Sequence, residues 1–181
     1  IFPVEELGEH RELLGEQGDR LTAELPVFIP PQGEKPLLEL LSALRGEGLS
    51  AALCGSPGAA ALARRAGLRV FGDWGLNILN SRAMAASRRW GVEDLTLSFE
   101  ANLRQAVSLE GGIPFGVIAY GHLPLMTFRA CPAQVPGLRR LPGEAVLRDR
   151  LGKEFPVLCH RRQYSQLLNS LPLYLGDKQD S

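Results

Sequence analysis

Short apolar runs alternate with amphipathic stretches from residue 25 to residue 121. Runs without helical spacing predict buried strands, whereas apolar residues three and four positions apart predict helices that bury one side. Strands are therefore predicted at residues 25–31, 49–56, 68–73, 94–100 and 114–121, and helices at residues 35–48, 58–67, 81–91 and 101–112. Residues 5–20 are charged and leucine-spaced, which predicts a short leading helix.

This alternation of strand and helix is typical of a parallel sheet with crossover helices, either doubly wound or part of a barrel. Gly46, Gly48 and Gly67 follow predicted helices as stop signals, and Ser81 is the expected N-cap of the helix at residues 81–91. The connections between predicted elements are short, as β-α units require. The sequence thus predicts an α/β fold built from repeated β-α units.

The rhythm changes after residue 121. Residues 123–130 form another apolar run, and residues 144–163 predict a β-hairpin in which Gly152 can take the positive φ of the turn. Residues 167–175 form a last apolar segment, and the tail at residues 179–181 is expected to be disordered.

Charge and cysteine content narrow the class of protein. The chain has 20 Lys and Arg against 20 Asp and Glu, so no global field attracts nucleic acid or a membrane. Three cysteines argue against a disulfide framework and predict a reducing, cytoplasmic location. No apolar run approaches the ~20 residues of a membrane span. The chain begins at Ile1 rather than Met, which predicts a fragment or a processed product.

Polar residues follow the ends of three successive predicted strands. Ligands bind at the carboxyl ends of the strands in parallel α/β folds, so these residues are expected to line one rim. They are Asp73, Asn77 and Asn80 after the third strand, Ser98, Glu100 and Asn102 after the fourth, and Tyr120 and His122 after the fifth.

Structural roles are the alternative for these residues. Asp73 and Asn80 would then be a turn acid and the first residue of a helix, and His122 would be structural. Four arginine pairs would be solvated faces or, if they converge, an RNA path; they are Arg64-Arg65, Arg88-Arg89, Arg139-Arg140 and Arg161-Arg162.

Five segments occur in an order that resembles the U32 family, known as collagenase-like peptidases, and especially its larger bacterial members. They are VFGDWGLNILNS, LTLSFEAN, VIAYGHLPLMTFRACP, LRDRLGKEFPVLCH and LLNSLPLYLGDK. The resemblance covers roughly residues 20–178.

The resemblance implies a TIM-like barrel with its site at the carboxyl ends of the strands, of which this chain would be the second half followed by a small β-hairpin region. The expected division is a helical lead-in at 1–22, a partial barrel at 23–130, a hairpin and cysteine region at 131–178, and the tail at 179–181. Half a barrel exposes two sheet edges. Its expected partners are the missing first half, a second U32-type chain or a second copy of itself.

The family also implies a [4Fe–4S] cluster held by four cysteines. Cys131 and Cys159 match the first and last ligands, but residues 133–146, where the middle pair should lie, contain no cysteine. Cys54 matches no ligand position. Three roles are therefore open for Cys131 and Cys159: buried thiols, a labile metal pair, or half of a cluster that another chain completes. This chain alone is expected to bind no cluster.

Three functions follow from the resemblance. The first is oxygen-independent hydroxylation of RNA or a small molecule, such as a quinone precursor. The second is peptide hydrolysis, and the third is a degenerate, non-catalytic partner subunit. Glu100 and Asp73 are the expected acid–base residues, because desolvation at a strand end raises a carboxyl pKa. Substrate would be bound by Asn77, Asn80, Ser98, Tyr120, His122 and Arg129.

Overall fold

The computed structural model describes residues 1–129, 140–141, 144–160 and 164–176. The chain forms two compact units, Ile1–Val117 and Ile118–Ser181. None of the helices in the described ranges is long and apolar enough to cross a bilayer.

The first unit is built on a six-stranded parallel sheet whose strands lie in chain order. They are β1 (Phe2–Pro3), β2 (Thr22–Glu24), β3 (Ala51–Cys54), β4 (Arg69–Gly72), β5 (Val92–Thr96) and β6 (Phe115–Gly116). Every neighbouring pair is parallel. The predicted α/β class with repeated β-α units is confirmed. The strand order does not reverse within the described sheet, so it lacks the switch point of a doubly wound fold.

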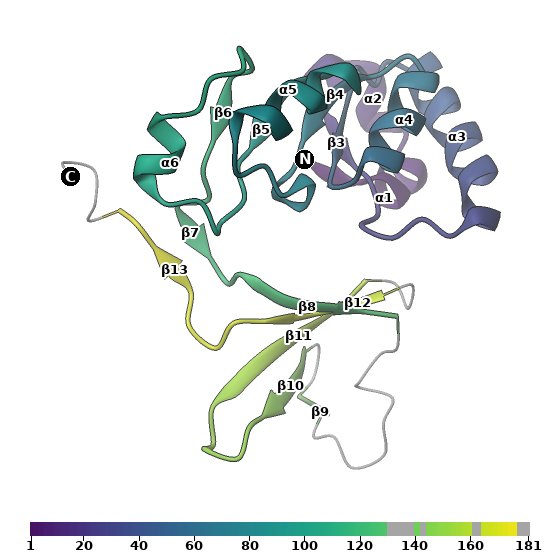
Figure 1. Cartoon of the computed structure of the whole chain (residues 1–181). Coiled ribbons are helices and arrows are strands. Elements are labelled where there is room, and N and C mark those ends of the chain that lie inside the picture. The colour runs from purple at the N-terminus through teal and green to yellow at the C-terminus, as the bar shows by residue number, and fades with distance from the viewer. Residues whose placement is uncertain (130–139, 142–143, 161–163, 177–181) are drawn as a thin grey trace. The chain divides into compact units, whose positions relative to one another are not determined.

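Helices connect these strands (Figure 1). They are α1 (Val4–Glu9), α2 (Glu12–Gln17), α3 (Pro31–Gly46), α4 (Pro57–Arg65), α5 (Ser81–Arg89) and α6 (Leu103–Val107), with 3-10 turns η1 (Gly18–Arg20) and η2 (Trp74–Leu76). Crossovers between parallel strands are right-handed, so strands in chain order place their helices on one face of the sheet. Helices α3 and α4 pack against each other on that face.

The strand predicted at residues 25–31 is wrong. Strand β2 ends at Glu24, and residues 25–30 form the loop before α3. Proline lacks the N–H that a central strand must donate, and this segment contains Pro26 and Pro30. Its apolar residues serve the core instead, because Leu25 is buried and Ile29 packs against the buried cluster.

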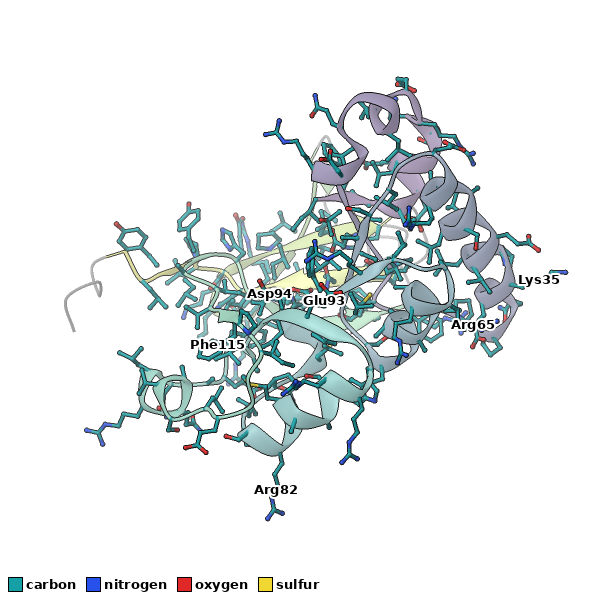
Figure 2. All side chains as sticks on the ribbon, turned by 90° about the horizontal axis from the view of Figure 1, so that it is seen from above. Lys35, Arg65, Arg82, Glu93, Asp94 and Phe115 are labelled. Atoms are coloured by element: carbon teal, nitrogen blue, oxygen red, sulfur yellow. The ribbon has the colours of Figure 1, made fainter. Side chains whose placement is uncertain are left out.

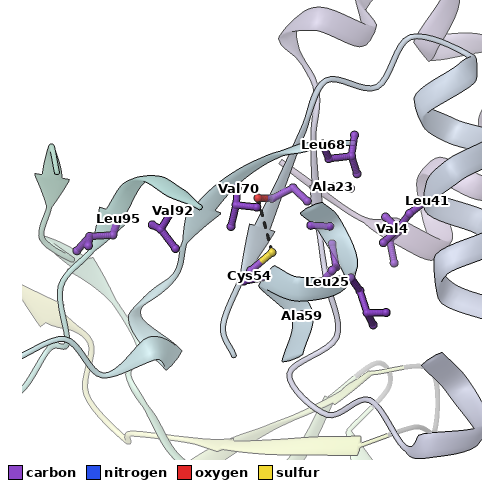
Figure 3. Packing of buried hydrophobic residues seen from close by; sticks show 14 of the residues in the cluster. Val4, Ala23, Leu25, Leu41, Cys54, Ala59, Leu68, Val70, Val92 and Leu95 are labelled. Carbon is purple, nitrogen blue, oxygen red and sulfur yellow. Dashed lines mark hydrogen bonds between the residues drawn. The ribbon is translucent and has the colours of Figure 1, made fainter. Parts of the chain in front are cut away.

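The core lies between the sheet and its helices. The register aligns Ala23, Ala52, Val70 and Val92 across four strands, and all four are buried. Figure 3 shows Ala23, Val70 and Val92 among the packed residues of this layer. Leu41 and Leu44 of α3 and Met84 of α5 are buried in the same cluster. Burial of each such large side chain contributes roughly 1.5–3 kcal/mol, so this layer dominates the stability of the unit.

The other face of the sheet is partly polar. The next register row joins Glu24, Leu53, Phe71 and Asp94, none of which belongs to the core cluster. Figure 2 shows Lys35 and Arg82 projecting outward from their helices, whereas Glu93 and Asp94 lie along the sheet. Beside this row the Arg69 Nε atom lies 2.8 Å from Glu93 Oε2. This face therefore carries charge, whereas the buried row of Ala23, Ala52, Val70 and Val92 carries none.

Arginines near the ends of the helices bond successive β-α units together. Arg45 donates to the Gly67 carbonyl at 3.2 Å, Arg64 to the Arg89 carbonyl at 3.1 Å and Arg88 to the Gly111 carbonyl at 3.4 Å. The Arg89 carbonyl is at the end of α5, where the helix itself leaves it without a partner, and the Gly67 and Gly111 carbonyls lie in the loops that follow α4 and α6. Arg64 and Arg88, one member of each of two predicted pairs, thus have structural roles.

The second unit contains antiparallel sheets. Strands β8 (Pro124–Phe128), β12 (Tyr164–Leu168), β11 (Glu154–His160), β10 (Glu144–Arg148) and β9 (Arg140–Leu141) form one in that order, and β7 (Tyr120–Gly121) pairs with β13 (Leu173–Tyr174). The predicted hairpin is confirmed as β10–β11. Gly152 has a φ of +80°, and the Asp149 carboxylate accepts N–H bonds from Leu151 and Lys153.

Candidate functional site

The carboxyl ends of β3 and β4 meet at a close backbone contact. Asp73 directly follows β4, and its N–H donates to the Cys54 carbonyl at 3.0 Å. A Cβ on Gly75 would lie 2.8 Å from the Gly55 carbonyl oxygen, and one on Gly55 would lie 4.0 Å from Asp73 Oδ2. The two glycines therefore let the loops touch and leave the Asp73 carboxyl beside Gly55.

Asp73 is the carboxyl group most affected by this environment. Burial raises the pKa of Asp73 to about 6, with a further upward contribution from the Glu24 carboxylate. A hydrogen bond from the Trp74 backbone N–H acts in the opposite direction. An acid that titrates near neutral pH is suited to both donating and accepting protons.

Glu24, the last residue of β2, was not among the predicted site residues. The predicted strand at residues 25–31 placed Glu24 before a strand rather than at its end. In the structure β2 ends at Glu24, so this carboxylate lies at the same edge of the sheet as Asp73. The signal was present in the segment LTAEL, where polar Thr22 and Glu24 alternate with apolar neighbours.

The Asp73 carboxyl should make stability depend on pH. Its pKa of about 6 in the fold is higher than the ordinary value of 3.8, so between these two pH values the folded state binds more protons than the unfolded state. Stability should therefore fall as pH rises from about 4 to about 6, by on the order of 2 kcal/mol. Chemical unfolding of wild type and Asp73→Asn between about pH 4 and pH 6 measures this loss of stability. The difference between the two proteins should change with pH; a constant difference would contradict the burial argument.

An aromatic contact joins the loops after β4 and β5. The Trp74 and Phe99 ring centroids lie 5.3 Å apart in a tilted arrangement. Near it, the Ser98 N–H donates to the Ile78 carbonyl at 3.3 Å. The structure thus brings the segments around Asp73 and Ser98 together. This agrees with the expectation that residues after successive parallel strands lie at one edge of the sheet.

Ser98 and Glu100 differ in burial. Ser98 is buried and its Oγ accepts the Glu100 N–H at 3.3 Å, whereas the Glu100 side chain is exposed. Of the two carboxyls expected to be desolvated, Asp73 is partly buried and Glu100 is exposed. Asn102 is the N-cap of α6 and exchanges side-chain to backbone hydrogen bonds with Gln105, so its role is that of a helix cap.

Asn77 and Asn80 have local structural roles. Asn77 has a φ of +53°, a left-handed conformation that asparagine tolerates better than most residues. Asn80 is the N-cap of α5, and its Oδ1 accepts the Ala83 N–H at 2.9 Å. Ser81 was the expected cap, so that prediction is wrong by one residue. The Ser81 hydroxyl instead accepts the Glu110 N–H at 2.9 Å.

Loss of the Asn80 cap should lower stability without affecting Asp73. Asn80→Ala leaves the Ala83 N–H without its partner, and we expect the free energy of unfolding to fall by about 1 kcal/mol. Asn80→Asp retains an accepting oxygen and is the matched control. Urea unfolding measures both variants. Equal stability of Asn80→Ala and wild type would show that water replaces the cap without cost.

Tyr120, His122 and Arg129 belong to the second unit. The strand predicted at 114–121 is split, because β6 covers only Phe115–Gly116 and β7 pairs antiparallel with β13. Tyr120 packs edge-on against Tyr174, with centroids 6.3 Å apart. His122 Nδ1 lies 2.6 Å from the Asn169 carbonyl oxygen. The strand that was expected to bring these residues to the rim is therefore not continuous.

The cysteines do not fit a four-thiolate cluster. Cys54 is fully buried beneath α4, where burial raises its pKa to about 12 (Figure 3). Cys159 is exposed on β11, with the Ser165 Oγ 3.5 Å from its sulfur. Cys131 lies outside the described residues. Among the described ranges, no three His, Cys, Asp or Glu side chains gather as a metal site. Three cysteines, one of them in the core, cannot supply four ligands.

The arginine pairs of the first unit lie away from the Asp73 edge. Arg64-Arg65 and Arg88-Arg89 end α4 and α5. Crossover helices run opposite to the strands they connect, so these helix ends lie at the amino edge of the sheet. Arg139, Arg161 and Arg162 fall outside the described residues. The described pairs therefore form no path leading to Asp73.

The chain matches no protein-family model, no curated protein and no solved structure. Its class is defined by its own strand order: an α/β fold with a six-stranded parallel sheet of β-α units, accompanied by small antiparallel sheets.

Proposed function

We propose that this chain is part of a U32-type enzyme in which Asp73 acts as the acid–base residue at the carboxyl edge of the sheet. The position of Asp73 carries the proposal, since its carboxyl lies partly buried beside Gly55 where β3 and β4 end. The reaction proposed from the resemblance is oxygen-independent hydroxylation of RNA or a small molecule. The residues of this chain bind substrate and move a proton, and no redox step is assigned to them.

The surroundings of Asp73 support a proton-transfer role. Burial raises its pKa to about 6, which brings the pKa of this carboxyl closer to neutral pH, as acid–base catalysis favours. Trp74, Phe99 and Ser98 stand in the adjoining loops and are proposed to border the substrate. Glu100 is proposed as a second, exposed acid–base residue of the same unit.

A TIM-like barrel is the proposed complete architecture. Parallel strands in unbroken chain order are the arrangement of a barrel segment. The partly polar face formed by Glu24, Phe71 and Asp94 would then line its interior. The missing strands are proposed to come from a first barrel half or from a second chain.

Peptide hydrolysis is the second candidate, favoured by the carboxyl pair Glu24 and Asp73. Burial, and in addition the Glu24 carboxylate, raises the pKa of Asp73, and a pair of neighbouring carboxyls can activate water. A nucleophile–histidine mechanism has less support. The histidines contact Glu12, the Asn169 carbonyl and Gln166 through their ring nitrogens, and none of these three partners is a hydroxyl or a thiol.

A non-catalytic partner subunit is the third candidate, favoured by the shortage of cysteines. Comparison of RNA nucleosides from cells with and without the gene, by mass spectrometry, tests the first candidate. We expect one hydroxylated nucleoside to disappear on deletion and return with the intact gene. Unchanged nucleosides, together with cleavage of casein by the purified protein, would favour hydrolysis; neither activity would favour the partner subunit.

A further inference from the structure

A cavity of about 390 Å³ lies between the loop that precedes α3 and the helix α4. All of its lining residues belong to the first unit, and the loop contributes Val27, Phe28 and Ile29. Neither Asp73 nor Glu24 lines it. Its volume and its mainly apolar walls are those of a small-molecule site. The cavity is therefore a candidate binding site separate from the Asp73 carboxyl.

Small residues on α4 leave the space for this cavity. Gly58, Ala61, Leu62 and Arg65 all line it, and their spacing of three, four and seven positions places them along one side of the helix. A Cβ on Gly58 would meet nothing within 4 Å, and Ala61 presents only a methyl group. The hollow thus follows from the small side chains in the first two turns of α4.

Two opposite charges also line the cavity. Glu34 stands in the first turn of α3 and Arg65 in the last turn of α4, where the helix dipoles favour these signs. Within the described part of the chain, neither side chain forms an ion pair or a hydrogen bond, with the other or with any further residue. One apolar surface is therefore bordered by a carboxylate and a guanidinium that are each available to a ligand.

This combination of walls selects the chemistry of the ligand. A purely apolar molecule would desolvate both charged groups without pairing them, which costs free energy. An anion would be attracted by Arg65 but repelled by Glu34, and a cation would experience the reverse. A molecule that carries both charges on an apolar body matches the two charged groups and the apolar wall together.

We propose that this cavity binds a small zwitterion with an apolar body. The cationic group of the ligand faces Glu34 and its anionic group faces Arg65. The apolar body packs against Phe28, Ile29 and Leu62. The site is independent of the reaction that Asp73 performs.

Isothermal titration of the 181-residue chain with ω-aminooctanoate tests this assignment, with octanoate and octylamine as probes that each lack one charge. We expect saturable binding of ω-aminooctanoate at one site, and binding of each singly charged probe weaker by at least about threefold. Ala61→Trp should abolish binding, because the indole ring would occupy the cavity and Ala61 is exposed enough to accept it. Circular dichroism establishes that each variant is folded.

Charge variants assign each end of the ligand to its partner. Arg65→Gln should weaken ω-aminooctanoate by at least about threefold but not octylamine, which has no carboxylate. Glu34→Gln should weaken ω-aminooctanoate similarly but not octanoate. Arg82→Gln is the matched control, because Arg82 projects outward from α5 and does not line the cavity (Figure 2).

Two results would overturn the proposal. The first is a wild-type chain that shows no saturable binding of ω-aminooctanoate. The second is binding that neither Arg65→Gln nor Glu34→Gln weakens, since apolar contact alone would then hold the probe.

Discussion

Asp73→Asn is expected to lower kcat/KM of the complete enzyme by about 10²- to 10⁴-fold, the usual contribution of a positioned acid or base. The amide is close in shape to the carboxyl and can still accept the Trp74 N–H, but it cannot exchange a proton at physiological pH. The loss should therefore appear in the rate while the fold remains intact. Nucleoside analysis of complemented cells, followed by steady-state kinetics on the identified substrate, measures it.

The pH profile identifies the direction of proton transfer. The Asp73 pKa is about 6, so an acid role predicts activity that falls as pH rises through this value, and a base role predicts the reverse. Either limb should be absent in Asp73→Asn. Glu39→Gln is the control, because Glu39 is an exposed residue of α3 with no contact to the site. An Asp73→Asn enzyme with wild-type rate and profile would remove Asp73 from the mechanism.

Gly75→Ala is expected to destabilise the first unit by about 1–3 kcal/mol, the usual cost of overpacking. The new Cβ would lie 2.8 Å from the Gly55 carbonyl oxygen and 3.2 Å from the Gly55 Cα. Both contacts are with backbone, so no side-chain rotation relieves them. The loops after β3 and β4 must separate, which also displaces the neighbouring Asp73 carboxyl. Activity should fall together with stability.

Gly58→Ala provides the comparison. A Cβ on Gly58 meets nothing within 4 Å, and the residue lies in the first turn of α4. Alanine is the better helix former, so this variant should be as stable as wild type or more stable by up to about 1 kcal/mol. Urea unfolding measures both substitutions. Equal stability of the two variants would show that the loops around Gly55 and Gly75 yield easily.

The sequence predicted elements best where local signals agree. The glycines that end helices, the leucine spacing of α3 and the hairpin turn at Gly152 each depend on near neighbours, and the structure confirms them. The strand prediction at residues 25–31 was wrong because hydrophobicity alone cannot distinguish a ladder strand from a loop that packs into the core. The split of residues 114–121 was missed because which sheet a strand joins depends on distant partners.

Alternation of strand and helix was enough to predict the α/β class, since period-two and helical apolar patterns are local properties. The polar residues at the ends of predicted strands likewise indicated Asp73 and Ser98 as candidate site residues. Tertiary structure alone decided that Asp73, rather than Glu100, is desolvated, and that Glu24 stands near it. It also decided that Asn80 is used as a cap and that Cys54 belongs to the core. Burial and electrostatic neighbours arise from strand register and loop contacts, which join residues far apart in the chain.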